Sequence, residues 1–171
     1  MRVTRNAAPC QSPKTRGCAY RVLVALADVN VRTPPNITFL RRGDALVLDF
    51  TKAYDPPPGG FLEVTIKPRR PPVLSPPVLI PPDKNALVYD GDEFFVFEER
   101  LEPGDTRARH SHRERVVIVL NRTRLQQWPD GSAPIFRDQI PDDVRFNPPV
   151  VHVVKNVGDR PLRNLVIEFK R

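Results

Sequence analysis

Short apolar runs alternate with turn signals along the whole chain, and helical periodicity is hard to find in it. Runs rich in Val, Leu, Ile and Phe that are bounded by Gly, Pro and Asp are typical of β-strands. Many short strands with frequent turns predict an all-β sandwich or barrel. The strands we expect cover residues 21–31, 44–50, 61–67, 86–89, 93–101, 115–125, 150–154 and 162–170.

A proline-rich segment, residues 68–83, interrupts this pattern. Its Pro-Pro pairs favour an extended polyproline II conformation, which forms semi-rigid spacers. Val and Leu residues punctuate the segment, which favours a linker or an arm packed along a barrel over a ligand for a proline-binding domain. We therefore divide the chain into residues 1–67, the linker or arm, and residues 84–171.

The two halves resemble each other. Residues 21–26 (RVLVAL) match residues 115–120 (RVVIVL), and FLEVTIK at 61–67 is similar to NLVIEFK at 164–170. An internal repeat of one β unit is the simplest interpretation.

Composition limits the possible functions. The formal charge is +7, but the arginines are spread along the chain and no nucleic-acid-binding motif accompanies them. We interpret them as a solvated surface and expect no nucleic-acid partner. No apolar run approaches the roughly 20 residues of a membrane helix, and no secretory h-region is visible, so we expect a cytoplasmic protein without a membrane partner. Cys10 and Cys18 are expected to be reduced thiols.

Only three histidines occur in the chain, and they form the candidate chemistry. His110 and His112 are two residues apart, so in a strand both imidazoles point to the same face. His152 lies in an apolar strand, where a lone histidine is more often a hydrogen-bonded core residue. Neutral imidazole is the commonest transition-metal ligand, however, and three imidazoles suit Fe, Mn, Ni, Cu or Zn. We predict that the three histidines bind one divalent transition metal.

The spacing of these residues resembles the two motifs of the cupin superfamily. The first motif, G-x5-H-x-H, matches Gly104, His110 and His112, and the second ends in H-x3-N, as do His152 and Asn156. Further matches are Asp142, Phe146 and the run KNVGDRPLR at 155–163. The resemblance covers residues 84–171. It implies a double-stranded β-helix (a cupin jelly-roll barrel), a metal at the three histidines, a small-molecule ligand or substrate, and a homodimer.

The chain also departs from the family pattern. The family's glutamate ligand would fall at Val116 or Val117, which leaves a site of three histidines without a carboxylate. Glu114 is a possible auxiliary ligand. Arg124 or Arg115 would suit an anionic or enolisable substrate oxygen if either points inward.

The first half lacks the ligands. At the offset of the repeat, Arg16 and Cys18 stand where His110 and His112 stand in the second half. We therefore predict that residues 1–67 form a smaller, degenerate cupin-like β unit without metal ligands.

Three functions remain open from the sequence. The first is a metal-dependent enzyme, with the resemblance pointing to dioxygenase- or isomerase-like chemistry. The second is a metal- or small-molecule-binding protein without turnover. The third is a purely structural barrel in which the histidines only form hydrogen bonds. Fold does not decide among them.

Overall fold

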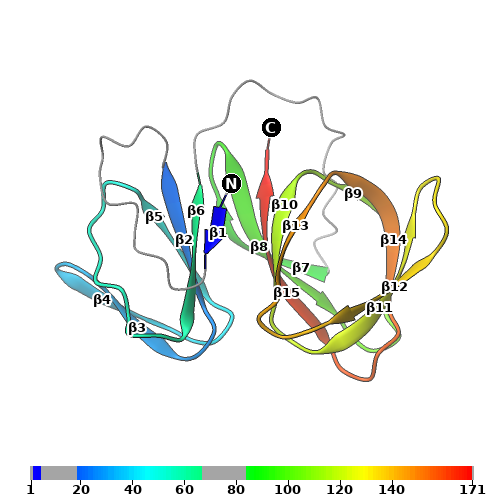
Figure 1. Cartoon of the computed structure of the whole chain (residues 1–171), viewed down its shortest axis with the longest axis horizontal. Coiled ribbons are helices and arrows are strands. Elements are labelled where there is room, and N and C mark those ends of the chain that lie inside the picture. The colour runs from blue at the N-terminus through cyan, green and yellow to red at the C-terminus, as the bar shows by residue number, and fades with distance from the viewer. Residues whose placement is uncertain (1, 5–18, 67–83, 171) are drawn as a thin grey trace. The chain divides into compact units, whose positions relative to one another are not determined.

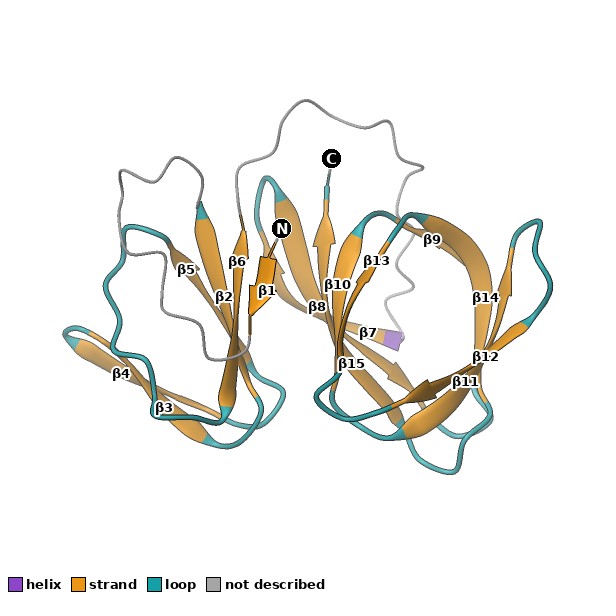
Figure 2. Cartoon of the chain, in the orientation of Figure 1, coloured by secondary structure: helices purple, strands orange, loops and turns teal. Residues whose placement is uncertain are grey.

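The computed structural model describes residues 2–4, 19–66 and 84–170, in which β-strands joined by turns and loops are nearly the only regular secondary structure (Figures 1 and 2). The chain divides into two compact units, Met1–Arg70 and Pro71–Arg171. The predictions for Cys10, Cys18 and Arg16 and for the proline-rich segment lie outside the described residues. The described residues include no helix that is long and apolar enough to cross a membrane.

The first unit contains an antiparallel sheet of order β1-β6-β2-β5 and a separate hairpin, β3-β4. Its strands are β1 (Arg2–Thr4), β2 (Tyr20–Ala25), β3 (Val29–Thr33), β4 (Asn36–Leu40), β5 (Ala45–Asp49) and β6 (Phe61–Ile66).

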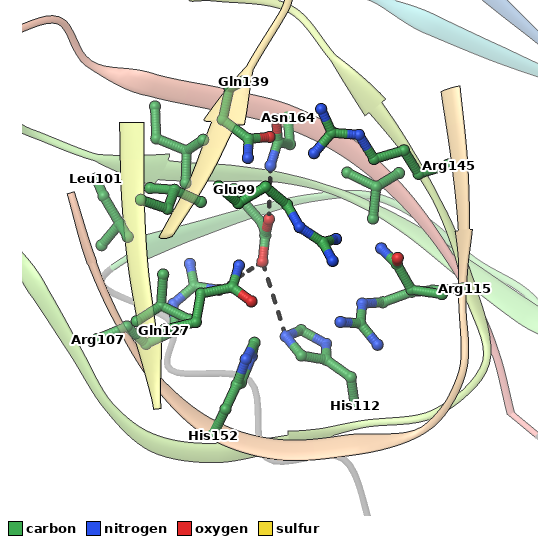
Figure 3. A pocket seen from close by; sticks show the side chains of 16 residues that line it. Glu99, Leu101, Arg107, His112, Arg115, Gln127, Gln139, Arg145, His152 and Asn164 are labelled. Carbon is green, nitrogen blue, oxygen red and sulfur yellow. Dashed lines mark hydrogen bonds and ion pairs between the residues drawn. The ribbon is translucent and has the colours of Figure 1, made fainter. Parts of the chain in front are cut away.

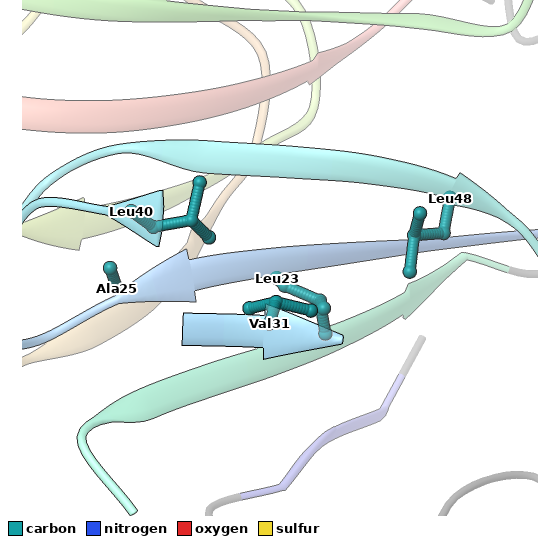
Figure 4. Close-up of a cluster of buried hydrophobic side chains, with 5 residues drawn as sticks. All are labelled: Leu23, Ala25, Val31, Leu40 and Leu48. Atoms are coloured by element: carbon teal, nitrogen blue, oxygen red, sulfur yellow. The ribbon is translucent and has the colours of Figure 1, made fainter. Parts of the chain in front are cut away.

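Residues of the sheet and the hairpin share an apolar core, shown in Figure 4 and made by Leu23, Ala25, Val31, Leu40 and Leu48. The predicted strand 21–31 is in fact two strands. Asp28 lies in the turn between them, where its Oδ1 accepts a hydrogen bond from the backbone N–H of Arg42. A side chain that pairs with backbone in this way favours a turn over a continuous strand.

The second unit consists of two antiparallel sheets, of order β13-β10-β15-β8-β7 and β12-β11-β14-β9. The prediction of an all-β, double-stranded β-helix class with a smaller N-terminal β unit is confirmed. The strands are β7 (Asn85–Asp90), β8 (Phe94–Leu101), β9 (Thr106–His112), β10 (Arg115–Val119), β11 (Thr123–Pro129), β12 (Ile135–Gln139), β13 (Val144–Asn147), β14 (Val150–Asn156) and β15 (Leu162–Phe169).

Strands β10 and β11 correct the predicted strand 115–125, because the chain turns at residues 120–122 and enters the other sheet. Strands β4, β12 and β13 were not predicted at all.

A bulge in β9 determines which of its side chains face the interior. His152 pairs with His110, whereas Val154 pairs with Arg107, so β9 uses three positions where β14 uses two. In a regular strand, residues three apart point to opposite faces. The extra residue lets Arg107, His110 and His112 all be buried in one interior.

Two motif residues have structural roles in this unit. Asn156 is fully buried, and its Nδ2 donates to the carbonyl oxygens of Leu101 (2.9 Å) and Arg160 (2.8 Å). Gly104 has a φ of +87°, which favours glycine, and its N–H donates to the carbonyl of Asn156. These contacts fix the ends of β8, β9 and β14, the last two of which carry the histidines.

Candidate metal centre

Strands β9 and β14 bring the three histidines together. His110 lies directly opposite His152, and His112 lies opposite Val150. All three side chains are buried, and their candidate ligand atoms lie within 4.8 Å of one another. No other group of this kind occurs among the residues that the structure describes, so the first unit contributes none from its described part.

Hydrogen bonds determine the tautomers of His110 and His112. Nδ1 of His110 lies 2.8 Å from the carbonyl oxygen of Ala108, which can only accept, so this nitrogen carries the proton. Nδ1 of His112 lies 2.8 Å from Oε2 of Glu168 and donates to that carboxylate. Each ring in its neutral form therefore has a bare Nε2, and the two Nε2 atoms lie only 3.0 Å apart. Two facing lone pairs repel each other unless a proton or a cation lies between or beside them.

Among the described residues, His152 has no hydrogen-bond partner for either ring nitrogen, although both nitrogens are buried. A buried polar group without a partner costs about 1–3 kcal/mol. Burial lowers the pKa of His152 to about 2 and that of His110 to about 4. Both rings are therefore neutral near pH 7, which is the form that binds a metal.

Glu168 is a buried carboxylate on β15 that sequence reasoning missed. Its side chain is fully buried, Oε2 accepts from His112, and Oε1 accepts from the backbone N–H of Arg113 at 2.6 Å. Phe97 on β8 stacks parallel to His112, with ring centroids 6.4 Å apart. Together these contacts hold the orientation of the His112 ring.

A cavity adjoins the histidines and is shown in Figure 3. It holds about 470 Å³ of space not filled by atoms, part of it open to solvent. His112 and His152 contribute to its wall, and Leu101, Leu125, Val154 and Leu162 form an apolar cluster along it. Val117, at one of the two positions of the family's glutamate ligand, also lines it and offers no ligand atom.

Glu99 is the only carboxylate among the described residues that line this cavity. Its Oε1 lies 2.7 Å from Nη1 of Arg107 and 3.8 Å from Nε2 of His112, and Asn164 donates to Oε2. Burial alone would raise the pKa of Glu99, but the positive charge of Arg107 and the contact with His112 lower it to about 2. Glu99 is therefore ionised at neutral pH, and no sequence pattern singled it out.

Two auxiliary residues suggested by the sequence lie away from the cavity. The side chain of Arg124 is 57% exposed and pairs with Asp138 at 3.6 Å. Leu125 and Gln127 on the same strand face the cavity, so strict alternation turns Arg124 outward, contrary to the expectation. Glu114 lies half-buried in the turn between β9 and β10, outside both the cavity wall and the histidine cluster.

Arg115 does line the cavity, and its Nη1 donates to the carbonyl oxygens of Arg113 (3.3 Å) and Pro148 (3.0 Å). Burial lowers the pKa of Arg115, while Glu99 and Glu168 oppose that change. Of the two arginines that the sequence offered, the structure thus brings only Arg115 to the cavity.

Comparisons with known proteins identify the fold. No family model matches the sequence, and no curated protein matches it. Among solved structures, AerE from Microcystis aeruginosa matches with a TM-score of 0.61 at 13% identity, over 91% of this chain and 80% of that one. A cupin 2 conserved barrel domain protein from Leptotrichia buccalis matches with a TM-score of 0.53 at 11% identity, over 89% and 74% of the two chains.

These similarities span nearly the whole chain but involve few identical residues, so they show the fold alone. They agree with the two antiparallel sheets of the second unit. The chain has the fold of the cupin superfamily.

Proposed function

We propose that the second unit binds a divalent transition metal through His110, His112 and His152, and that it binds or converts a small organic molecule in the adjoining cavity. The observation that carries this proposal is the state of the imidazole nitrogens. Two bare Nε2 atoms face each other at 3.0 Å, and a third ring beside them has no partner at all.

The alternative without a metal explains only part of this arrangement. A proton shared between His110 and His112 would remove the repulsion of their lone pairs, but it would leave both nitrogens of His152 buried without a partner. A cation bound by all three rings would satisfy the Nε2 atoms of His110 and His112 and one of the two nitrogens of His152. Three neutral nitrogen donors suit Fe, Mn, Ni, Cu or Zn, whereas Mg and Ca prefer oxygen ligands.

A metal on three histidines would have coordination positions open to a small molecule and would act on it as a Lewis acid or redox centre. The chain's own residues prepare the site. Glu168 fixes the proton of His112 on Nδ1, and Arg107 holds the negative charge of Glu99 near the same ring. Apolar side chains such as Leu125 and Val154 limit the water in the cavity.

A binding role without turnover is the second candidate, and the pKa values of the cavity favour it over a proton-transfer enzyme. Glu99 and His152 both have pKa values of about 2, so neither is an effective general base near neutral pH. Dioxygenase-like chemistry does not require such a base on the protein, whereas an isomerase does. Assays of oxygen uptake and of proton exchange on 2-oxo acids would separate these possibilities.

Elemental analysis tests the metal proposal. Wild-type protein reconstituted with Zn²⁺ or Ni²⁺ and then desalted should retain about one metal per chain. The variants His110→Ala and His152→Ala should retain far less, since two imidazoles seldom hold a divalent ion well.

Arg124→Ala is the matched control, because its side chain is exposed and lies outside the cavity. It should retain as much metal as the wild type. Full metal content in both histidine variants would refute the site, and far-ultraviolet circular dichroism would show that the variants remain folded.

A further inference from the structure

The charges that line the cavity do not balance. Four arginines line it, and Glu99 is the only carboxylate among the described residues that do so. Arg107 is paired with Glu99 at 2.7 Å, and Arg145 is paired with Asp143 at 3.1 Å. Two guanidinium groups remain, those of Arg115 and Arg137.

Arg137 is the clearer of these two. It comes from β12, where alternation places Arg137 and Gln139 on the cavity side. Within the part of the chain that the structure describes, the side chain of Arg137 forms no hydrogen bond and no ion pair. Its side chain is half-buried, and burial together with the charge of Arg145 lowers its pKa.

Arg115 faces the same cavity from the other sheet. Its guanidinium is buried and donates to two backbone carbonyl oxygens, which hold it in place but do not neutralise it. No carboxylate lies within ion-pair distance of it among the described residues, although Glu99 and Glu168 act on it from further away. The positive charge of Arg137 also repels that of Arg115 and lowers the pKa of Arg115.

Buried positive charges without a contacting counter-ion are costly, and proteins usually pair them. We propose that Arg115 and Arg137 bind the carboxylate of a small organic anion, whose other end points toward the three histidines. The guanidinium group matches the planar carboxylate in geometry and can bind it through two parallel hydrogen bonds. This inference rests on the proposed function, because it names the class of molecule that the metal centre would receive.

The rest of the cavity favours an organic anion over a simple inorganic ion. Leu101, Leu125, Val154 and Leu162 form an apolar surface that a phosphate or sulfate ion would not contact favourably. A molecule with a carboxylate at one end and an apolar body matches both the arginines and this apolar surface.

Isothermal titration calorimetry on the zinc-loaded protein with benzoate tests this inference. Benzoate combines a carboxylate with an apolar ring, and benzamide is its neutral isostere. We expect saturable binding of benzoate and at least about ten-fold weaker binding of benzamide, because charged hydrogen bonds are stronger than neutral ones. Inorganic phosphate should bind more weakly than benzoate, and equal or tighter phosphate binding would refute the organic ligand in favour of an inorganic anion site.

Variants locate the site of binding. Arg137→Gln should weaken benzoate binding about ten-fold or more, and Arg115→Gln should do so as well if it folds. Arg124→Gln is the matched control and should bind benzoate like the wild type, since its side chain is exposed and paired with Asp138. Unchanged affinity in Arg137→Gln, or no saturable benzoate binding by the wild type, would overturn the proposal.

Metal content measured on the same samples separates the two proposals. A chain that holds one metal but does not bind benzoate contradicts the anion site and leaves the metal site intact. A chain that binds benzoate through Arg137 but holds no metal supports the anion site and contradicts the proposed function.

Discussion

Glu168 lies outside the three proposed ligands but determines which ring nitrogen of His112 is free. Its carboxylate accepts the Nδ1 proton of His112, which leaves Nε2 free to bind a cation. Carboxylates in this position raise the basicity of the ligand and fix its ring orientation. Because Glu168 also accepts from the backbone of Arg113, it is itself held in place.

Glu168→Gln should lower the affinity for a bound metal by about 10–100-fold while leaving the three ligands in place. The amide oxygen can still accept from His112, but the negative charge is lost. Competition with a chelator of known affinity would measure the change. Glu114→Gln is the control, since Glu114 lies outside the histidine cluster, and its affinity should equal that of the wild type. An unchanged affinity in Glu168→Gln would contradict the role given to this carboxylate.

Of the individual residues at the site, the sequence pointed to the three histidines and to few others. The H-x-H spacing and the third histidine of the chain predicted a cluster that the structure brings together. Glu99 and Glu168 stayed hidden, because strands that are buried on both faces give no alternation from which to tell an inward carboxylate. The sequence could not show which of Arg115 and Arg124 points into the cavity. The two residues lie on separate strands, β10 and β11, and the turn between these strands decides which way each side chain points.

The bulge of β9 compensates for the odd spacing of three positions between Arg107 and His110. Deleting Arg109 would remove the extra residue and restore a regular ladder with β14. Arg107 and His110 would then be two positions apart, so regular alternation would keep Arg107, His110 and His112 on the interior face. We expect the deletion variant to retain metal and to keep the pair of Arg107 with Glu99, as elemental analysis and thermal unfolding would show.

Arg109→Ala keeps the number of residues and is the matched control. The Arg109 side chain is 66% exposed and pairs with Asp130, so its loss should change stability little. Loss of metal from the deletion variant, with full retention in Arg109→Ala, would contradict this account of the bulge.

Strands β8 and β15 are also joined by an ion-pair network around Glu98. Arg100 donates two hydrogen bonds to its carboxylate at 2.9 Å, and Arg163 of β15 donates a third. Burial opposes ionisation of Glu98, but these contacts hold its pKa below the usual range. The resulting stabilisation is present above the usual pKa of a glutamate and is lost as the pH falls through the lowered value.

Glu98→Gln should therefore unfold more easily than the wild type at pH 7, and the difference should shrink as the pH falls below the usual pKa of 4.5 toward the lowered pKa of Glu98. Urea unfolding at several pH values measures it. A difference that stays constant over this range would show that the charge of Glu98 contributes nothing to stability.

The strands themselves were predicted unevenly. Long apolar strands such as β8 and β15 were predicted nearly to their ends, because burial on both faces gives continuous apolar runs. Strands β12 (IFRDQ) and β13 (VRFN) were missed, since they are short and mix exposed aromatic residues with polar ones. Yet β12 and β13 supply Arg137 and Arg145 to the cavity, so the arginines of the cavity could not be predicted either.

For the whole molecule, the all-β class and the cupin fold followed from the strand pattern and the resemblance, and the structural comparisons agree. The positions of the charged side chains in the fold did not follow from the sequence. The arginines were interpreted as a solvated surface, but Arg107 and Arg115 are only 2% and 7% exposed. Composition cannot tell an interior arginine from an exposed one, because only the fold decides which face is inside. The repeat relationship of the two units and the homodimer stay predictions.

The most direct test of the account is an anomalous difference map from crystals of the zinc-loaded protein, recorded at the zinc absorption edge. The account predicts one strong peak per chain, bound by His110, His112 and His152, with Glu168 still paired to His112. A map without a peak at these histidines, or with its only peak elsewhere, would contradict the metal centre and leave a cupin barrel whose histidines do not bind metal.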